Sequence, residues 1–199
     1  MPTRVRLNTR VEILSLVLSL VAYGCGTESP RGQQNVTTSA ETVSVNELQS
    51  QNSTIQSDTG KKSDWVELYN DGDTDVSLAG YFISDDKDAL EKAMLPEAAV
   101  VPAQGFLVLW LDDTTNDETP LHFPFKLSGD GENFFFASPA GKVIRKVVLP
   151  ADPTGTNTGA ADVSYGSYPD GSYAMGWCRT PTPGKPNAAD CSGGSDAGS

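Results

Sequence analysis

Short hydrophobic runs separated by turn residues fill the chain from Val43 to Cys191. In residues 64–70, Val66 and Leu68 point to one face of an extended strand, and the residues between them point to the other. Similar runs recur between clusters of Gly, Pro, Asn and Asp, which are the residues that tight turns favour. The pattern therefore predicts β-strands with frequent turns and little helix.

Two pairs of runs are predicted as β-hairpins. The run 64–70 leads through the turn 70–73 to the apolar run 76–83, with Gly72 expected to supply a positive φ. The runs 133–137 and 142–149 are joined by a Pro- and Gly-containing turn, 138–141.

Other runs complete the predicted fold. Residues 106–111 are six apolar residues in a row, which indicates a strand buried on both faces in the centre of the core. Only residues 87–94 have helix-forming composition, and Pro96 would end that helix after two turns. Further strands are expected at 43–48, 121–127 and 174–178. Roughly eight or nine short strands in total predict an all-β sandwich.

The first 24 residues have the features of an export signal. Arg4, Arg6 and Arg10 precede an apolar stretch, 13–22, which is too short to span a bilayer. The following residues, Val-Ala-Tyr-Gly before Cys25, resemble a bacterial lipobox, so we expect cleavage before Cys25 and its lipidation. Ordinary secretion with cleavage after the same run is the alternative.

These features predict four parts along the chain. Residues 1–24 are the lipoprotein signal peptide, 25–42 a polar flexible tether, 43–191 the folded domain and 192–199 a disordered tail. The protein is expected in the cell envelope, anchored to the membrane by its N-terminal lipid. Gly26 follows the cysteine where inner-membrane lipoproteins carry Asp, so a Gram-negative host would place it in the outer membrane. In another host we expect it on the extracellular face of the membrane.

The charge balance argues against nucleic acid as a partner. The chain has 14 basic and 26 acidic residues, a net charge of −12. Removal of Arg4, Arg6, Arg10 and Glu12 with the signal leaves 11 basic and 25 acidic residues, a net charge of −14. Such a chain repels phosphate backbones.

The three cysteines divide into one and two. Lipidation of Cys25 leaves Cys178 and Cys191 as an even pair in an oxidising compartment, so we predict a disulfide between them. Two free thiols at a flexible end are the alternative.

No enzymatic arrangement of residues is recognisable, and no cofactor is expected. His122 is the only histidine, which excludes multi-histidine zinc sites, and it lies beside aromatic residues as a structural or surface histidine would. Neither a Gly-rich phosphate loop nor a Gly-x-Ser-x-Gly elbow occurs. The protein is therefore predicted not to be an enzyme.

Acidic and aromatic clusters leave two binding alternatives open. Acidic turns are expected to be solvated, with calcium as the alternative, at Asp71/Asp73/Asp75, Asp85/Asp86/Asp88 and Asp112/Asp113/Asp117/Glu118. The first cluster fails as an EF-hand because Phe82 occupies the twelfth position. Aromatic residues are expected to pack the sandwich, with a glycan-stacking platform as the alternative, at Trp65, Tyr69, Tyr165, Tyr168, Tyr173 and Trp177.

An ordered series of short motifs spans residues 43–187. They are Val45-Asn46-Glu47-Leu48, the run 64–70, Leu78-Ala79-Gly80-Tyr81, residues 101–106, 125–128 and 164–171, and the closing run 180–187. Together they resemble the lamin tail domain in its bacterial, exported form. The positions that carry the resemblance are Asp64, Trp65, Glu67, Leu68, Tyr69, Asn70, Gly80, Ser164, Tyr165, Gly166, Pro183 and Gly184.

The resemblance implies an immunoglobulin-like β-sandwich that binds, scaffolds or tethers proteins at the membrane. Lamin tail domains in bacteria often accompany membrane-associated hydrolases, and in nuclear lamins they contact proteins and chromatin. The acidic charge of this chain argues against contact with chromatin, and the Cys178/Cys191 pair is not part of the family's general pattern. We therefore expect a non-enzymatic envelope lipoprotein with an unidentified protein partner. A glycan-binding or calcium-dependent adhesive module is the alternative.

Overall fold

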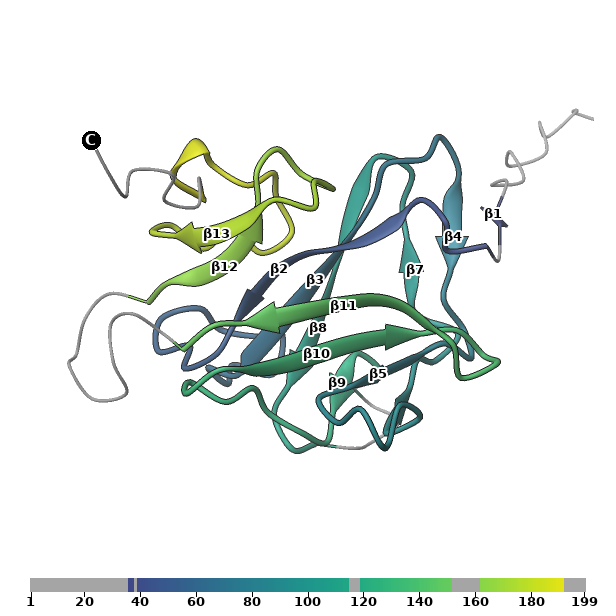
Figure 1. Cartoon of the computed structure of the whole chain (residues 1–199), viewed down its shortest axis with the longest axis horizontal. Helices are drawn as coiled ribbons and strands as arrows, with labels where there is room; N and C mark the ends of the chain where they lie inside the picture. Colours follow the sequence, from purple (N-terminus) through teal and green to yellow (C-terminus); the bar gives the residue numbers. More distant parts are fainter. Residues whose placement is uncertain (1–35, 38, 115–118, 152–161, 192–199) are drawn as a thin grey trace, which may run out of the picture. The chain divides into compact units, whose positions relative to one another are not determined.

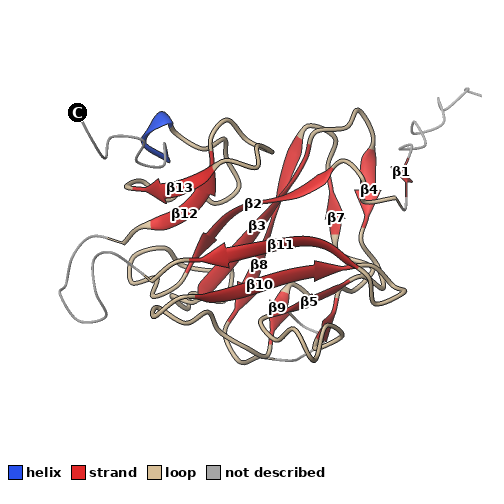
Figure 2. Ribbon diagram, viewed as in Figure 1, coloured by secondary structure: helices blue, strands red, loops and turns tan. Residues whose placement is uncertain are grey.

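The computed structural model describes residues 36–37, 39–114, 119–151 and 162–191. They belong to one unit, Gln34–Ser199. Apart from one 3-10 turn, η1 (Ala189–Cys191), the regular elements in these ranges are β-strands (Figure 2). The helices of the described residues include none that is long and apolar enough to cross a membrane.

The largest sheet has six strands in the order β13-β12-β2-β3-β8-β9. Neighbouring strands in this sheet are antiparallel, except that β8 and β9 run parallel to each other. The strands are β2 (Val43–Gln49), β3 (Asp64–Asn70), β8 (Gly105–Leu111), β9 (His122–Phe123), β12 (Ser164–Ser167) and β13 (Met175–Cys178).

A second sheet has four antiparallel strands in the order β11-β10-β5-β6, and a small third sheet has the order β1-β4-β7. The second sheet contains β5 (Phe82–Ser84), β6 (Ala93–Met94), β10 (Glu132–Ala137) and β11 (Val143–Leu149). The third contains β1 (Val36–Thr37), β4 (Asp75–Ser77) and β7 (Val100–Val101). Figure 1 shows β10 and β11 crossing over the β2-β3-β8 layer.

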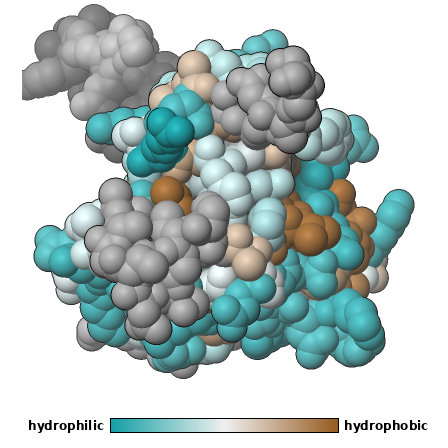
Figure 3. Space-filling view, turned by 60° about the vertical axis from the view of Figure 1, so that its left-hand side comes forward, coloured by the Kyte–Doolittle hydropathy of each residue, from teal (hydrophilic) through white to brown (hydrophobic). Residues whose placement is uncertain are grey.

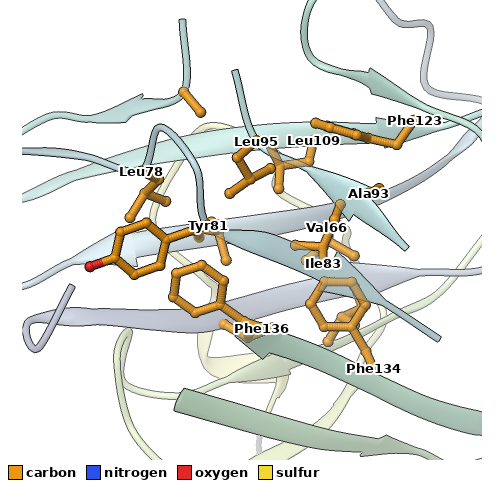
Figure 4. Close-up of a cluster of buried hydrophobic side chains, with 14 of the residues drawn as sticks. Val66, Leu78, Tyr81, Ile83, Ala93, Leu95, Leu109, Phe123, Phe134 and Phe136 are labelled. Atoms are coloured by element: carbon orange, nitrogen blue, oxygen red, sulfur yellow. The ribbon is translucent and has the colours of Figure 1, made fainter. Parts of the chain in front are cut away.

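The core lies between these two layers. Val66 and Leu68 of β3 contribute from the large sheet, and Phe134 and Phe136 of β10 from the second sheet, all with no exposed surface. Figure 4 shows Val66, Ile83 and Phe134 converging in this interior. Alternation along each strand supplies one apolar face to the core, which is the physical basis of a β-sandwich.

The all-β sandwich class is confirmed, and so is the second predicted hairpin. β10 and β11 pair antiparallel through the turn 138–141, with Gly141 at φ 70°. The predicted segments 43–48 and 174–178 correspond closely to β2 and β13. The segment 121–127 forms only the two-residue strand β9.

The first predicted hairpin is wrong. β3 pairs with β2 and β8, whereas β4 pairs with β1 and β7 in the third sheet. The turn between them is built by Asn70, whose Nδ2 donates to Thr74 O at 2.8 Å and whose Oδ1 accepts from Gly72 N at 3.0 Å. Gly72 does not have a positive φ. A Cβ there would lie 3.0 Å from Asn70 Oδ1, so the glycine provides room.

The predicted helix at 87–94 is also wrong. Ser84 Oγ donates to Ala89 O at 2.8 Å, and Asp88 N donates to Asp86 Oδ1 at 2.8 Å. These hydrogen bonds between side chains and backbone stabilise turns in place of a helix. Ala93 and Met94 then pair with β5 as β6. Tertiary pairing overrides the helix-forming composition.

β8 is less buried than its six apolar residues predict. Leu109 and Leu111 are fully buried, but Val108 and Trp110 on the other face are only half-buried. Beyond β8 the sheet continues only with the two-residue β9. The strand therefore lies near the edge of its sheet.

Pairing extends into the segment that we predicted as a tether. β1 pairs in parallel with β4, and Val43 N donates to Ala40 O at 3.1 Å. The described fold therefore begins before Val43. The predicted signal peptide and disordered tail lie outside the described residues.

Adjacent positions on β11 test the packing directly. Leu149 is 1% exposed and Val148 is 60% exposed. We expect Leu149→Ala to lower the free energy of unfolding by about 2–5 kcal/mol, because it leaves a core cavity. Val148→Ala is the matched control and should cost less than about 1 kcal/mol, the range of strand propensities. Chemical denaturation measures both, and equal losses would contradict the assigned faces of the strand.

Candidate functional site

Two carboxyl groups are buried opposite each other in the large sheet. Glu47 of β2 pairs in register with Glu67 of β3, and neither has exposed surface. The register shifts between Val45 and Glu47, which marks a β-bulge at Asn46. A bulge lets successive residues share one face. Asn46 can therefore donate from Nδ2 to Glu67 Oε1 at 2.9 Å beside Glu47.

A C-terminal segment, residues 179–188, covers these carboxyl groups and supplies backbone donors to them. Thr182 N donates to both oxygens of Glu47 at 3.2 Å, and Gly184 N donates to Glu67 Oε2 at 2.5 Å. Asn187 N donates to Asp170 Oδ1 at 2.9 Å. Three amides outside regular secondary structure therefore each have a carboxyl acceptor. We call this arrangement the carboxyl network.

β12 completes the network from the other side. Ser164 Oγ donates to Glu47 Oε1, and Asn187 Nδ2 donates to Ser167 O at 2.8 Å. Gly166 lies between them, and a Cβ there would stand 2.9 Å from Asn187 Nδ2 and 3.0 Å from Cys178 Sγ. Glycine leaves room at this position, because a side chain would displace the Asn187 side chain or the Cys178 sulfur.

Burial dominates the electrostatics of the network. Desolvation raises the pKa of Glu47 to about 7 and that of Glu67 to about 8, against a partial opposing effect of their hydrogen bonds. The proximity of Glu47 and Asp170 raises the pKa of Glu67 further. Like charges this close disfavour double ionisation. The network therefore binds protons more tightly in the folded state than in the unfolded chain.

The other predicted positions on β3 also serve the fold. Asp64 accepts from Gln51 N and Leu127 N, both at 2.9 Å, and so fixes two loops. Trp65 is fully buried, with Nε1 donating to Gln49 Oε1 at 2.7 Å. Tyr69 stacks against Phe106 with ring centroids 4.9 Å apart.

The remaining predicted positions lie in different parts of the fold. Leu68 is in the core, and Gly80 takes φ 79° while its N–H donates to Leu95 O at 2.9 Å. Tyr165 packs against Trp177. Pro183 precedes Gly184, whose φ of 77° lets the chain turn its amide toward Glu67. The structure thus brings Glu67, Ser164, Gly166 and Gly184 together.

Sequence reasoning missed five network members as site residues: Asn46, Glu47, Asp170, Thr182 and Asn187. All lie within the motifs noted above. The signal available in β2 was the adjacent polar pair Asn46 and Glu47, which interrupts the alternation of the strand. Partners more than a hundred residues away cannot be read from that pattern.

The disulfide pairs Cys178 with Cys191, 13 positions apart, as predicted. It joins the end of β13 to η1 and so closes the C-terminal segment into a loop over the network. A loop of this length stabilises the folded state by about 3 kcal/mol through the lost entropy of the unfolded chain. Cys25 lies outside the described residues.

His122 is buried between two aspartates. Its Nδ1 lies 2.9 Å from Asp112 Oδ2 and its Nε2 lies 2.6 Å from Asp58 Oδ1. Burial opposes ionisation of Asp112, but hydrogen bonds with His122 and Thr114 outweigh it and lower the pKa of Asp112. Both ring nitrogens are thus occupied by carboxyl groups, which fixes β9 against the loops that carry the aspartates.

Residues of the acidic clusters form local hydrogen bonds and ion pairs. Asp75 Oδ1 accepts from Ala103 N at 2.9 Å, Asp85 pairs with Lys92 at 2.6 Å, and Asp113 pairs with Lys126 at 2.8 Å. Within the described ranges, no group of three or more His, Cys, Asp or Glu side chains is placed to hold a metal ion. Asp117 and Glu118 lie outside those ranges.

The aromatic residues do not share one face. Tyr165 is opposite Leu48, which is opposite Val66, so Tyr165 points toward the core side. Trp65 is adjacent to Val66 and points the other way, where it is fully buried. The visible face in Figure 3 is mostly hydrophilic, with small hydrophobic patches. Tyr168 and Tyr173 remain exposed, at 44% and 85%.

Two packed β-layers, closed on one face by polar contacts with the C-terminal segment, define an immunoglobulin-like β-sandwich. The family model described as Lamin Tail Domain matches residues 37–165 of the chain. The chain therefore belongs to the lamin tail domain family, which is an immunoglobulin-like, non-enzymatic family typical of protein interaction. No curated protein matches the chain.

The match ends at Tyr165, before most of β12, β13 and the C-terminal segment. Those later residues nevertheless supply Thr182, Gly184 and Asn187 to the network. The folded unit of this chain therefore extends beyond the matched residues to Cys191.

The carboxyl network predicts a pH-dependent stability. Folded pKa values of about 7 and about 8 lie above the unfolded value of 4.5, so the folded state binds more protons in between. The free energy of unfolding should therefore fall as the pH rises from about 5 to about 8, by up to about 1.4 kcal/mol per pH unit for each carboxyl group. Chemical denaturation across this range measures the slope.

The matched variants are Glu67→Gln, in the network, and Glu97→Gln, on an exposed loop. Glu67→Gln should flatten the fall, because one titrating group is gone, and Glu97→Gln should leave it unchanged. A wild-type stability that rises over the same range, or equal slopes in both variants, would contradict the raised pKa values.

Proposed function

We propose that this chain is a non-enzymatic lipoprotein of the bacterial cell envelope whose lamin tail domain binds other proteins and holds them at the membrane. The observation that carries the proposal is that the polar residues of the family motifs are engaged inside the fold. Glu47, Glu67, Asp64 and Asn70 are all buried and hydrogen-bonded within the fold. They support a scaffold, and binding is left to loops and sheet edges.

The sequence of the first 25 residues supports the anchor. Three arginines, an apolar stretch of about ten residues and a lipobox-like run before Cys25 are the order in which lipoprotein signals are built. Diacylglyceryl and N-acyl chains together exceed the one-chain limit for stable membrane binding. Gly26 favours the outer membrane in a Gram-negative host.

The contacts of His122 and of the buried carboxyl pair favour a binding role over catalysis. His122, the only histidine, has both ring nitrogens against carboxyl groups, which occupies the atoms that a relay to a nucleophile would need. Glu47 and Glu67 are covered by the C-terminal segment. A carboxyl pair that is covered in this way is not accessible to a substrate.

The anchor is tested by Cys25→Ser in a bacterial host that processes lipoproteins. The wild-type protein should incorporate a labelled fatty acid and sediment with membranes. Cys25→Ser should lose the label, because the thiol is the acylation site, while Cys178→Ser should keep it. Equal labelling of wild type and Cys25→Ser would contradict lipidation.

The binding role is tested by purifying the native lipoprotein from cross-linked envelopes, in parallel with glycan arrays probed with and without chelator. We expect a specific protein partner that survives chelation and is released only by reversal of the cross-link. Calcium-dependent glycan retention without a protein partner would contradict the proposal and favour the adhesive module. A hydrolase activity lost in His122→Ala would favour an enzyme.

A further inference from the structure

β11 forms a long open edge of the second sheet. It is seven residues long and pairs on one side with β10, and the described residues include no strand on its other side. The opposite edge of this sheet is β6, which has only two residues. An open edge of this length presents a row of backbone donors and acceptors to which a further strand can be added.

A groove separates this edge from the first half of β2. β12 pairs with β2 only at Glu47 and Leu48, so Val43–Val45 has no strand on that side among the described residues. The groove has a volume of about 250 Å³ and is lined by Ser44 and Val45 of β2 and by residues 144–147 of β11, with Gly171–Tyr173 and Met175. We call it the β2–β11 groove. Figure 1 shows β11 running beside β2.

A second cavity continues along β11. It has a volume of about 370 Å³, and Ile144 and Arg145 line both cavities. The second cavity includes one acidic residue, Glu41, whereas the lining of the β2–β11 groove has none. The length of β11 and the two adjoining cavities suit an extended chain.

The hairpin that carries β11 is locally basic. Lys142, Arg145 and Lys146 have no acidic partner within ion-pair distance among the described residues, although the chain has a net charge of −12. Four other lysines do have such partners: Lys61, Lys87, Lys92 and Lys126. Lys62, Arg179 and Lys185 also have no such partner among the described residues, but Lys142, Arg145 and Lys146 are grouped on one hairpin. This grouping in so acidic a protein favours a partner that supplies negative charge.

Two residues of the groove have buried polar atoms without a partner. Arg145 Nε and Ser44 Oγ are buried and have no hydrogen-bond acceptor or donor in the described residues. Arg145 otherwise lies 5.5 Å from the Tyr173 ring centroid and donates from Nη1 to Ile144 O at 3.0 Å and from Nη2 to Glu41 O at 3.5 Å. Buried polar groups are normally satisfied, so these two atoms indicate that polar partners are missing along the groove.

We propose that the β2–β11 groove binds an extended, acidic segment of a partner protein, which adds as a strand to β11 and places a carboxylate against Arg145. This inference rests on the proposed protein-binding function and names the class of its partner. Main-chain hydrogen bonds to β11 supply the affinity, and the pairing of the carboxylate with Arg145 selects the sequence.

A second copy of this chain fits the groove less well. In a register centred on Arg145 and Lys146, antiparallel pairing of two β11 edges would bring these residues of one copy against the same residues of the other. Like charges opposite each other in a sheet are destabilising. Charge complementarity therefore favours an acidic partner over self-association.

Synthetic peptides test the recognition. The probes are capped nine-residue peptides of alternating threonine and valine with Glu, Gln or Lys at the centre, and a Glu peptide with alternate amides N-methylated. The protein is the full chain carrying Cys25→Ser, with backbone amides observed by NMR. The Glu peptide should shift the amides of 143–149 and 43–45, and the Gln, Lys and N-methylated peptides should bind at least about tenfold more weakly.

Arg145→Gln should weaken the Glu peptide about tenfold, because it removes a charge-assisted hydrogen bond. Lys62→Gln, an exposed cation outside the groove, should leave its affinity unchanged. Equal binding of the Glu and Lys peptides, undiminished binding of the N-methylated peptide, or no shifts at β11 with any peptide would overturn the proposal.

Photo-cross-linking in the envelope separates this inference from the proposed function. A photoreactive residue replaces Val148, on β11, or Met94, on β6, which are similarly exposed at 60% and 63%. We expect a protein cross-link from position 148 that Arg145→Gln weakens. Protein cross-links from position 94 alone would overturn the groove and leave the binding function standing. An absence of protein cross-links from both positions, with no partner in the native purification, would count against both.

Discussion

Two carboxyl groups that face each other inside a β-sheet impose the constraint on which this fold depends. Glu47 and Glu67 have no exposed surface, and a buried carboxyl group without donors is costly. The sheet supplies only side-chain donors, from Asn46 and Ser164, because its own amides pair between strands. The C-terminal segment supplies them through Thr182 and Gly184, so one face of the sandwich is closed by polar contacts rather than by a third apolar layer.

Several features of the molecule follow from that closure. Gly166 leaves room for the Asn187 side chain to approach β12, and the Cys178–Cys191 bond keeps the segment close when the contacts open. β12 pairs with β2 only at Glu47 and Leu48, which leaves the first half of β2 without a described strand on that side. The open groove at β11 is thus a consequence of how the carboxyl groups are covered.

Features that depend on alternation and turn residues were predicted correctly from the sequence. The sandwich, the β10–β11 hairpin and the pairing of the two cysteines follow from local pattern and from counting. The partners of β3 and β4 do not, because pairing between strands is decided by packing across the whole sheet. The helix expected at 87–94 failed for the same reason, since Ala93 and Met94 gain strand partners that composition cannot show.

Only part of the site could be identified from the sequence. Motif positions such as Glu67 and Gly184 were identified, but their roles depend on a contact between residues 117 positions apart. Arg145 gave no signal, because an arginine in an alternating strand is normally solvated. Only the fold shows that it lines two cavities and that its Nε has no acceptor.

Amide hydrogen exchange at Thr182, Gly184 and Asn187 tests the central claim most directly. These amides lie outside the strands, and each donates to a buried or half-buried carboxyl group. We predict that they exchange on the order of 10³-fold or more slowly than exposed amides, as core-strand amides do. Exchange at the rate of an exposed loop would contradict a fold closed by its buried carboxyl groups.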